Sequence, residues 1–283
     1  MNYSAFKILT QGLTGNKGWK PAWRDPKPKD SYDVVIVGGG GHGLSTAHYL
    51  AKTYGITNVA VLEKGWLGSG NIGRNTTIIR SNYMLPGNEP FYELSLKLWE
   101  GLEQDFNYNA MVSQRSILNL FHSDPQRDAF VRRANAMMLA GADAELADQQ
   151  QLRRELPFLD FDNARFPIKG GLYQRRGGTV RHDAVAWGYA RGADSRGVDI
   201  IQNCEVTGFH IENGQCSGVE TSQGPIKARK VAVCVAGSSS RVMAQAGMRL
   251  PIESHVLQAS LTAGLTPTLP GQITLAAAHF HLT

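Results

Sequence analysis

Three glycines and one acidic residue form the clearest chemical pattern in this chain. Gly38, Gly40 and Gly43 are spaced as G-x-G-x-x-G directly after the apolar run Val34–Val37, and Glu63 follows Gly43 by 20 residues. The first glycine permits a tight turn, the second lets the backbone approach a pyrophosphate, and the third lets a helix pack closely on a strand. Glu63 stands where an acid binds a ribose hydroxyl. The pattern predicts a dinucleotide site, and the acid argues against a 2′-phosphate, which leaves FAD or NAD.

Regular elements on both sides must hold these residues in place. The β-branched run Val34–Val37 predicts a buried strand, Leu44–Leu50 a helix, and Val59–Leu62 a second strand. The N-terminus of that helix directs N–H groups and the positive end of its dipole towards phosphates. The alternative interpretation is a glycine-rich turn that binds nothing.

Composition narrows the class of protein. The chain has 283 residues, 42% of them hydrophobic, with 29 basic and 24 acidic side chains and a net charge of +5. The basic residues are scattered, so we expect no nucleic-acid binding. The three cysteines have no metal-binding spacing, so we expect no metal site, and they fit a reducing compartment. We find neither a membrane-spanning run nor a signal peptide, and therefore expect a cytoplasmic protein without membrane attachment.

A second glycine-rich loop follows Glu63 and ends in two basic residues, Arg74 and Arg80, with Thr76 and Thr77 between them. Such a loop can approach a planar cofactor closely. Its glycines are Gly65, Gly68, Gly70 and Gly73. The helix after the loop carries Phe91, Leu94, Leu98 and Leu102 at helical spacing, and we expect this apolar stripe to pack on the core.

Further elements are predicted along the rest of the chain. Helices are expected over 124–140, 148–156 and 183–195, and strands over 112–122, 169–174, 252–258 and 273–281. Four short strands are expected over 198–237, with a hairpin turn at Asn213-Gly214. A β-meander followed by a buried strand and a glycine turn is typical of flavoproteins with a dinucleotide-binding domain.

These patterns predict an α/β fold with a Rossmann-like, FAD-binding parallel sheet of the glutathione-reductase or D-amino-acid-oxidase type, a β-meander, and an incomplete antiparallel substrate domain. Residues 1–31 are interpreted as an extended arm that docks on this subunit or another, or else as a frayed terminus. The expected FAD-binding domain comprises 32–111 and 160–250. The expected parts of the substrate domain are 112–159 and 251–283.

Three motifs, VVIVGGGGHGLSTAHYL, VLEKGWLGSGNIGRNTTIIRSNY and KVAVCVAGSSS, resemble the glycine-oxidase and sarcosine-oxidase family of amine-oxidising flavoproteins, related to D-amino-acid oxidase. The segments GGTVRHDAVAWGYARGAD and IQNCEVTGF, with the arm, are similar to the beta subunits of heterotetrameric sarcosine oxidases. The resemblance extends over nearly all of residues 1–260.

The resemblance implies an activity, two flavins and several partners. Sarcosine is oxidised to glycine and formaldehyde, and electrons pass from non-covalent FAD to FMN and then to oxygen, which gives hydrogen peroxide. The FMN is covalent, attached to His182, with Arg181 beside it. Without the resemblance, His182 would be interpreted as a surface or capping residue. The other subunits are alpha, gamma and delta, and a partner subunit carries NAD and handles tetrahydrofolate.

The resemblance also assigns site residues. Arg80, in TIIR, fills the place of the arginine that grips the substrate carboxylate, and Arg74 could substitute for it. Single-chain relatives have a basic residue where this chain has Thr77. Further cofactor contacts are implied at Lys64, Gly73, Arg74, Val206 and Gly237.

Relatives continue past the end of this chain with a substrate-domain sheet and a late glycine motif, so we expect a truncated product or a fragment. Two alternative functions stay open. One is a dehydrogenase or oxidase of another secondary amine or amino acid, such as dimethylglycine, proline or glycine. The other is an inactive, truncated flavin-binding subunit.

Overall fold

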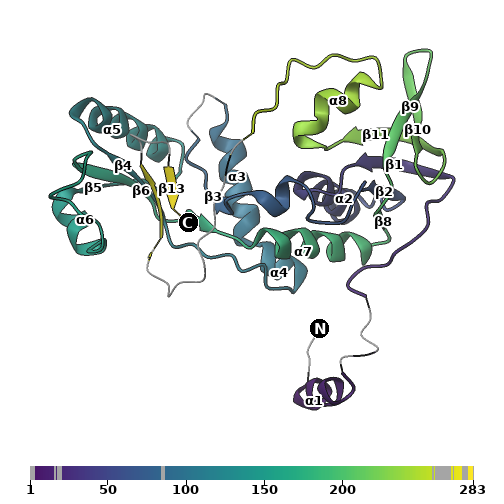
Figure 1. Cartoon of the computed structure of the whole chain (residues 1–283), viewed down its shortest axis with the longest axis horizontal. Coiled ribbons are helices and arrows are strands. Elements are labelled where there is room, and N and C mark those ends of the chain that lie inside the picture. The colour runs from purple at the N-terminus through teal and green to yellow at the C-terminus, as the bar shows by residue number, and fades with distance from the viewer. Residues whose placement is uncertain are drawn as a thin grey trace. The chain divides into compact units, whose positions relative to one another are not determined.

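A computed structural model describes residues 4–15, 17, 21–83, 87–256, 258, 269, 271–275 and 280–282. The chain divides into two compact units (Figure 1). The first unit comprises Met1–Arg74, Phe106–Tyr108 and His182–Leu257. The second comprises Asn75–Asp105, Asn109–Arg181 and Gln258–Thr283.

The first unit is built on one sheet with the strand order β8-β2-β1-β11-β10-β9. Its strands are β1 (Ser31–Val37), β2 (Val59–Leu62), β8 (Asp199–Ile201), β9 (Val206–Glu212), β10 (Gln215–Thr221) and β11 (Ile226–Val233). β1 pairs in parallel with both β2 and β11, and β2 pairs in parallel with β8. The central strands are rich in Val and Ile, and successive residues such as Val35 and Ile36 are fully buried, as in a parallel sheet covered on both faces. The predicted parallel sheet with a β-meander is confirmed.

Helices of the first unit include α2 (Gly41–Tyr54) and α7 (His182–Asp194), which pack against each other (Figure 1). α2 ends at Gly55, whose φ of 68° is the left-handed conformation that terminates helices. The shorter helical segments are η1 (Asn71–Arg74), η2 (Ala236–Ser238) and α8 (Ser239–Ala244). α7 also contacts η1, so one helix packs on both α2, which follows the first glycine loop, and η1, which ends the second.

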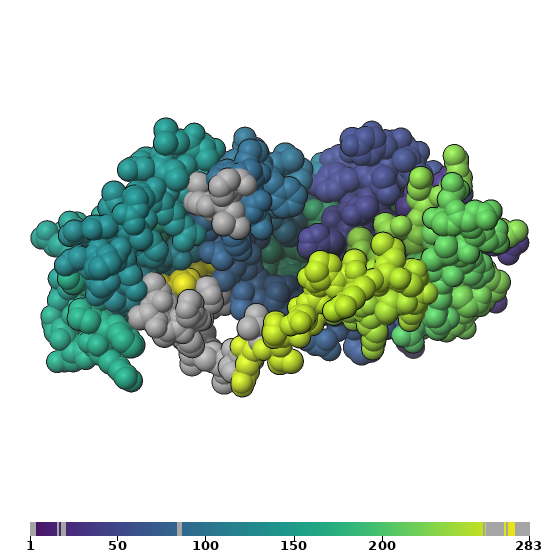
Figure 2. All heavy atoms as spheres, turned by 90° about the horizontal axis from the view of Figure 1, so that it is seen from above, coloured from purple at the N-terminus to yellow at the C-terminus, as the bar shows by residue number. Residues whose placement is uncertain are grey.

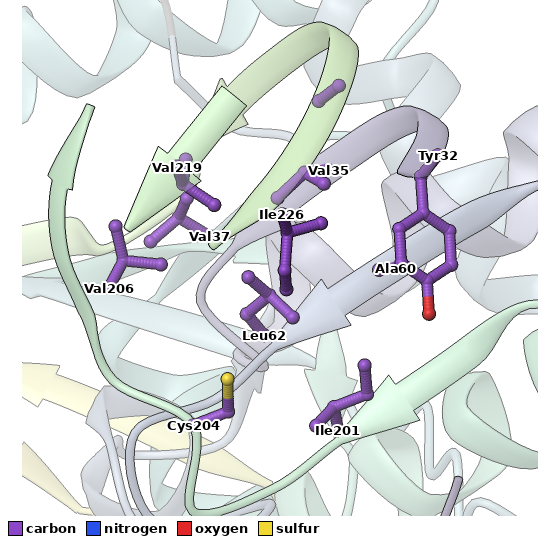
Figure 3. Packing of buried hydrophobic residues seen from close by; sticks show 11 residues of the cluster. Tyr32, Val35, Val37, Ala60, Leu62, Ile201, Cys204, Val206, Val219 and Ile226 are labelled. Carbon is purple, nitrogen blue, oxygen red and sulfur yellow. The ribbon is translucent and has the colours of Figure 1, made fainter. Parts of the chain in front are cut away.

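The core of this unit lies on one face of the sheet, where side chains of β1, β2 and β8 meet those of the meander (Figure 3). The cluster comprises Tyr32, Val35, Val37, Ala60, Leu62, Ile201, Cys204, Val206, Val219, Ile226 and Ala228. The turn between β9 and β10 has Asn213 at φ 52° and Gly214 at φ 75°. Two successive positive φ angles are the mark of a type I′ hairpin, as the Asn-Gly pair predicts.

The N-terminal arm is not extended throughout, because residues Ala5–Leu13 form the helix α1. Ser4 caps this helix by accepting the Lys7 N–H, and none of the helix residues is buried.

The later part of the arm is anchored on its own unit. Lys29 Nζ lies 2.7 Å from a carboxylate oxygen of Asp199, and Arg24 pairs with Asp194 at 2.8 Å. The Tyr32 hydroxyl also donates to Asp199, which is 1% exposed, and burial raises the pKa of Tyr32 to about 12. A buried carboxylate needs such partners, so these contacts fix the entry into β1.

The second unit contains a sheet in the order β13-β12-β4-β6-β5 and a small β3-β7 ladder. Its strands are β3 (Ile78–Ile79), β4 (Ile117–Phe121), β5 (Glu145–Asp148), β6 (Gly170–Gln174), β7 (Gly178–Thr179), β12 (Gln272–Leu275) and β13 (Phe280–Leu282). Its helices are α3 (Glu89–Glu100), α5 (Asp124–Leu139) and α6 (Gln149–Glu155), and α4 (Leu102–Phe106) ends where the chain returns to the first unit. The sheet is mixed, because β12 pairs in parallel with β4.

Helix α3 contradicts the predicted packing. Of the four predicted apolar residues, Leu102 is buried, but Phe91, Leu94 and Leu98 on α3 are 68%, 57% and 41% exposed, and Glu93 is buried in their place. Glu93 turns inward because its carboxylate pairs with Arg176 at 2.6 Å and accepts the Ser81 hydroxyl at 3.0 Å. The buried ion pair and hydrogen bond of Glu93 turn this face of α3 inward, and the face with Phe91, Leu94 and Leu98 is left exposed.

The unit boundaries differ from the predicted domains. The stretches 75–105, 109–111 and 160–181 were expected in the FAD-binding domain and belong to the second unit, whereas 251–257 were expected in the substrate domain and belong to the first. The reason is strand pairing: β3 pairs with β7, and β6 lies between β4 and β5. The predicted strand 252–258 is also wrong over its described part, because 252–256 form no strand. The chain after α8 lies at the surface (yellow-green in Figure 2), and Val256 is 97% exposed.

Candidate functional site

The first glycine loop has a different physical requirement at each glycine. Gly38 has a φ of 108°, and a Cβ there would overlap the carbonyl oxygen of Cys234. A Cβ on Gly43 would overlap the carbonyl oxygen of Gly38. Gly38 therefore makes the turn, and Gly43 lets α2 approach the end of β1.

Gly40 is the N-cap of α2, and it differs from the other two glycines. A Cβ added to Gly40 would meet no atom of the described residues within 4 Å, and the φ of −81° at Gly40 suits any residue. Gly40 also provides no side chain to cap α2. The first-turn N–H groups have no partner within a helix, and the open space beside Gly40 leaves room for an anionic group to approach this end of α2.

Glu63 at the end of β2 joins the two glycine loops. One carboxylate oxygen accepts the Gly39 N–H and the other accepts the Gly65 N–H, both at 2.9 Å. A carboxylate has about four lone-pair positions, so two are left for a ligand hydroxyl. The predicted acid is thus in place beside the loop, and it has a second role in holding the loops together.

The loop after β2 repeats the geometry of the first loop. Gly68, Gly70 and Gly73 are themselves spaced as G-x-G-x-x-G. Gly68 has a φ of 95°, a Cβ on Gly73 would overlap the Gly68 carbonyl oxygen, and a Cβ on Gly70 would meet nothing within 4 Å. The short helix η1 begins directly after Gly70. The repeated spacing is a sequence signal of this second turn, beyond the assignment of Gly73 alone.

Strain follows directly after this loop. Thr77 has a φ of 62°, a left-handed conformation that is a genuine outlier for a β-branched residue. Its N–H donates to the Asn75 side chain at 2.7 Å, and its carbonyl accepts the Val180 N–H at 3.0 Å. These hydrogen bonds stabilise the strained conformation of Thr77, which lies in the sequence between Arg74 and Arg80. Strained backbone of this kind is common at functional sites. Of the two arginines, Arg74 is exposed.

Arg80 lies in the second unit, in a cluster of polar and aromatic side chains. Its Nε donates to the Tyr83 hydroxyl and its Nη1 donates to Asn82 Oδ1, each at 3.2 Å. The guanidinium carbon is 4.4 Å from the centre of the Tyr83 ring, a cation–π distance. No carboxylate of the described residues pairs with Arg80, so its charge is available to an anionic ligand.

His182 is the first residue of α7 and is partly buried. Its Nδ1 atom is buried and has no hydrogen-bond partner among the described residues. Arg181 beside it is exposed, and its N–H donates to the Ala110 carbonyl. Gly178, shortly before His182, is in β7, where a Cβ would overlap the Ser113 carbonyl oxygen, so this glycine serves close strand packing.

The remaining assigned residues have separate surroundings. The Val206 side chain is buried in the core, so a cofactor contact there would involve its backbone (Figure 3). The Gly237 carbonyl accepts the Ser254 hydroxyl at 2.7 Å, and Lys64 is exposed. Among the described residues, we find neither a group of three metal-ligating side chains nor a helix long and apolar enough to cross a membrane.

Comparison with known proteins identifies the fold family. The family model for FAD dependent oxidoreductases (DAO) matches residues 33–282. The chain belongs to this family. Within it the chain groups with the sarcosine oxidase beta subunits: it is 71% identical to sarcosine oxidase subunit beta of Rhizobium meliloti (strain 1021), over all of this chain and 68% of that protein. It is 48% identical to the protein of that name from Rhodobacter capsulatus, over 94% of this chain and 64% of the relative.

The chain thus spans about two thirds of the length of these curated relatives. Among solved structures it resembles L-proline dehydrogenase from P. horikoshii, with a TM-score of 0.78 and 24% identity, over 90% of this chain and 67% of the other. This family member therefore has the fold of FAD-dependent amino-acid oxidoreductases.

The residues of the first unit fit FAD. The open space at Gly40 can admit a pyrophosphate, and the uncapped N-terminus of α2 complements its charge. Glu63 retains acceptor positions for a ribose hydroxyl. A flavin-dependent oxidoreductase needs such a site to orient its cofactor, since the cofactor carries the redox chemistry.

Proposed function

We propose that this chain is the FAD-binding subunit of an enzyme that oxidises sarcosine with water and oxygen to glycine, formaldehyde and hydrogen peroxide. The observation that carries the proposal is an FAD-compatible glycine-loop pair in a chain 71% identical to a sarcosine oxidase beta subunit. The chemistry that bound FAD supplies is acceptance of a hydride from the N-methyl carbon, and water hydrolyses the resulting imine.

In this proposal the protein binds and orients the substrate. Arg80 grips the substrate carboxylate, because it is a cation without a carboxylate partner among the described residues and its planar fork suits two carboxylate oxygens. Arg74 is the second candidate for this role and is exposed. Gly38, Gly40, Gly43, Gly73 and Glu63 hold the FAD without a covalent bond.

The proposal also includes a second flavin. Covalent FMN is attached to His182 and passes electrons from FAD to oxygen. A ligand there is supported by the Nδ1 atom of His182, which is buried and has no hydrogen-bond partner in the part of the chain that the structure describes. Arg181 is proposed to contact the anionic part of this flavin, because it is a neighbouring cation. Partner subunits of the alpha, gamma and delta types complete the enzyme, one of them binding NAD and tetrahydrofolate, and the complex is cytoplasmic.

The test is to purify the chain with its partner subunits and to measure its visible absorbance and its hydrogen peroxide production with sarcosine. Flavin absorbance and peroxide formed in equal amount to formaldehyde are expected. Dimethylglycine, proline and glycine serve as the comparison substrates. Turnover of one of them, with none of sarcosine, would reassign the substrate, and flavin binding without any turnover would favour a non-catalytic subunit.

The FMN assignment is tested separately by mass spectrometry of the denatured complex. A tryptic peptide containing His182 is expected to have the added mass of FMN, and His182→Asn is expected to lose the adduct while FAD remains bound. An unmodified His182 peptide from the wild-type complex would refute the attachment.

A further inference from the structure

A second arginine lies beside Arg80. Arg133 is on α5, and burial together with the nearby charge of Arg80 lowers the pKa of its guanidinium. Two neighbouring guanidinium groups repel each other, and the repulsion is stronger where burial excludes water.

Asn82 connects the two arginines. Arg133 Nη2 donates to the Asn82 backbone carbonyl at 2.6 Å, while Arg80 Nη1 donates to the Asn82 side-chain oxygen at 3.2 Å. Asn82 is fully buried. The orientation of Arg80 therefore depends on Asn82, and the position of Asn82 depends in turn on Arg133.

The cluster formed by Arg80, Asn82 and Arg133 has more hydrogen-bond donors than acceptors and an excess of positive charge. Arg133 Nε and Asn82 Nδ2 are buried without acceptors, and no carboxylate pairs with either arginine among the described residues. The nearby carboxylate of Glu93 is already used by Arg176 and Ser81. Ser81 is itself held by Gln174, whose side-chain oxygen accepts the Ser81 N–H at 3.1 Å. What the cluster lacks is an anion.

We propose that Arg133 is a positioning residue of the carboxylate-binding site: it holds Asn82, and thereby Arg80, and its uncompensated charge adds to the attraction for a carboxylate. The inference rests on the proposed role of Arg80 and extends it to a site with two arginines. Such a site selects amines that carry a carboxylate over neutral amines, because a neutral ligand leaves the repulsion between the guanidinium groups unrelieved.

The chain offers a matched control. Arg132 is the preceding residue of α5 and is exposed, so Arg132→Met removes the same charge from the same helix without touching Asn82. Arg133→Met keeps an unbranched apolar stem, and Arg133→Lys keeps the charge while losing the planar fork.

The experiment uses the full chain with FAD and its partner subunits. Kinetics with sarcosine are measured together with the binding of propionate and of its neutral counterpart propionamide. In Arg133→Met the KM for sarcosine and the Kd for propionate are expected to rise about tenfold, equivalent to roughly 1.4 kcal/mol of lost attraction. Propionamide binding and kcat are expected to change little, Arg133→Lys to recover part of the loss, and Arg132→Met to match the wild type.

Three results would overturn the inference: unchanged propionate affinity in Arg133→Met, an equal loss for propionamide, or an equal loss in Arg132→Met. Absence of propionate binding by the wild type would overturn it as well. If the wild type fails to oxidise sarcosine and still binds propionate in an Arg133-dependent way, the proposed substrate is wrong and the two-arginine site stands.

Discussion

Alanine substitutions at Gly40 and Gly43 separate ligand binding from folding. A methyl group at Gly40 enters open space at an ordinary φ, so Gly40→Ala is expected to change the stability of the ligand-free protein by less than about 1 kcal/mol. The same methyl group at Gly43 overlaps the Gly38 carbonyl oxygen. Forcing α2 away from β1 is expected to cost about 1–3 kcal/mol or more.

Added FAD is expected to reveal the defect of Gly40→Ala that the ligand-free protein does not show. At a free concentration of about 100 times its Kd, FAD stabilises the wild type by about 2.7 kcal/mol. This corresponds to a rise of about 4–5 °C in the midpoint of thermal unfolding for a chain of 283 residues. Gly40→Ala is expected to lose this rise, because its methyl group occupies the space of the pyrophosphate.

The assay is differential scanning fluorimetry with and without added FAD, on the chain stripped of its cofactor. Gly70→Ala and Gly73→Ala provide the same contrast in the second loop, since only Gly73 has a backbone oxygen in the path of its Cβ. A full FAD-induced rise in Gly40→Ala would refute the placement of the pyrophosphate. A normal unfolding midpoint for ligand-free Gly43→Ala would refute the packing explanation.

Other predictions concern the loops and the second unit. Glu63→Gln is expected to lose one of two loop hydrogen bonds, to lower stability by about 1–3 kcal/mol, and to weaken FAD binding, as shown by thermal unfolding and FAD titration. Thr77→Asn is expected to raise stability by about 0.5–1 kcal/mol in denaturant unfolding, because Asn tolerates a positive φ; a decrease would argue against strain. Hydrogen bonds from Arg176 lower the pKa of Glu100 in the folded protein. In acid the unfolded chain therefore protonates Glu100 more readily than the folded chain does, and the free energy of unfolding falls as the pH falls below about 4.5. In Arg176→Met the midpoint of thermal unfolding, measured between pH 3 and 7, is expected to fall less steeply in acid. An unchanged pH dependence would contradict the role of Arg176 in lowering the pKa of Glu100.

The sequence alone was sufficient for the features that depend on neighbours along the chain. The run Val34–Val37, the glycine spacing that follows it and the Asn213-Gly214 pair predict a strand, a tight turn into a helix and a hairpin, and all three elements form. Phosphate binding at the tight turn stays a prediction. These succeed because β-branched side chains and positive φ angles act over a few residues. Glu63 lies beside the first glycine loop because it follows a strand paired with β1, and its contact with a ribose stays a prediction.

Tertiary structure decided which faces are buried and which charges meet. The apolar spacing of α3 predicts burial of Phe91, yet the helix buries Glu93, because Arg176 reaches it from 83 residues along the chain. The approach of Arg133 to Asn82 spans 51 residues and leaves no local signal. Ion pairs and hydrogen bonds of this kind depend on strand pairing in three dimensions, which residue spacing does not encode.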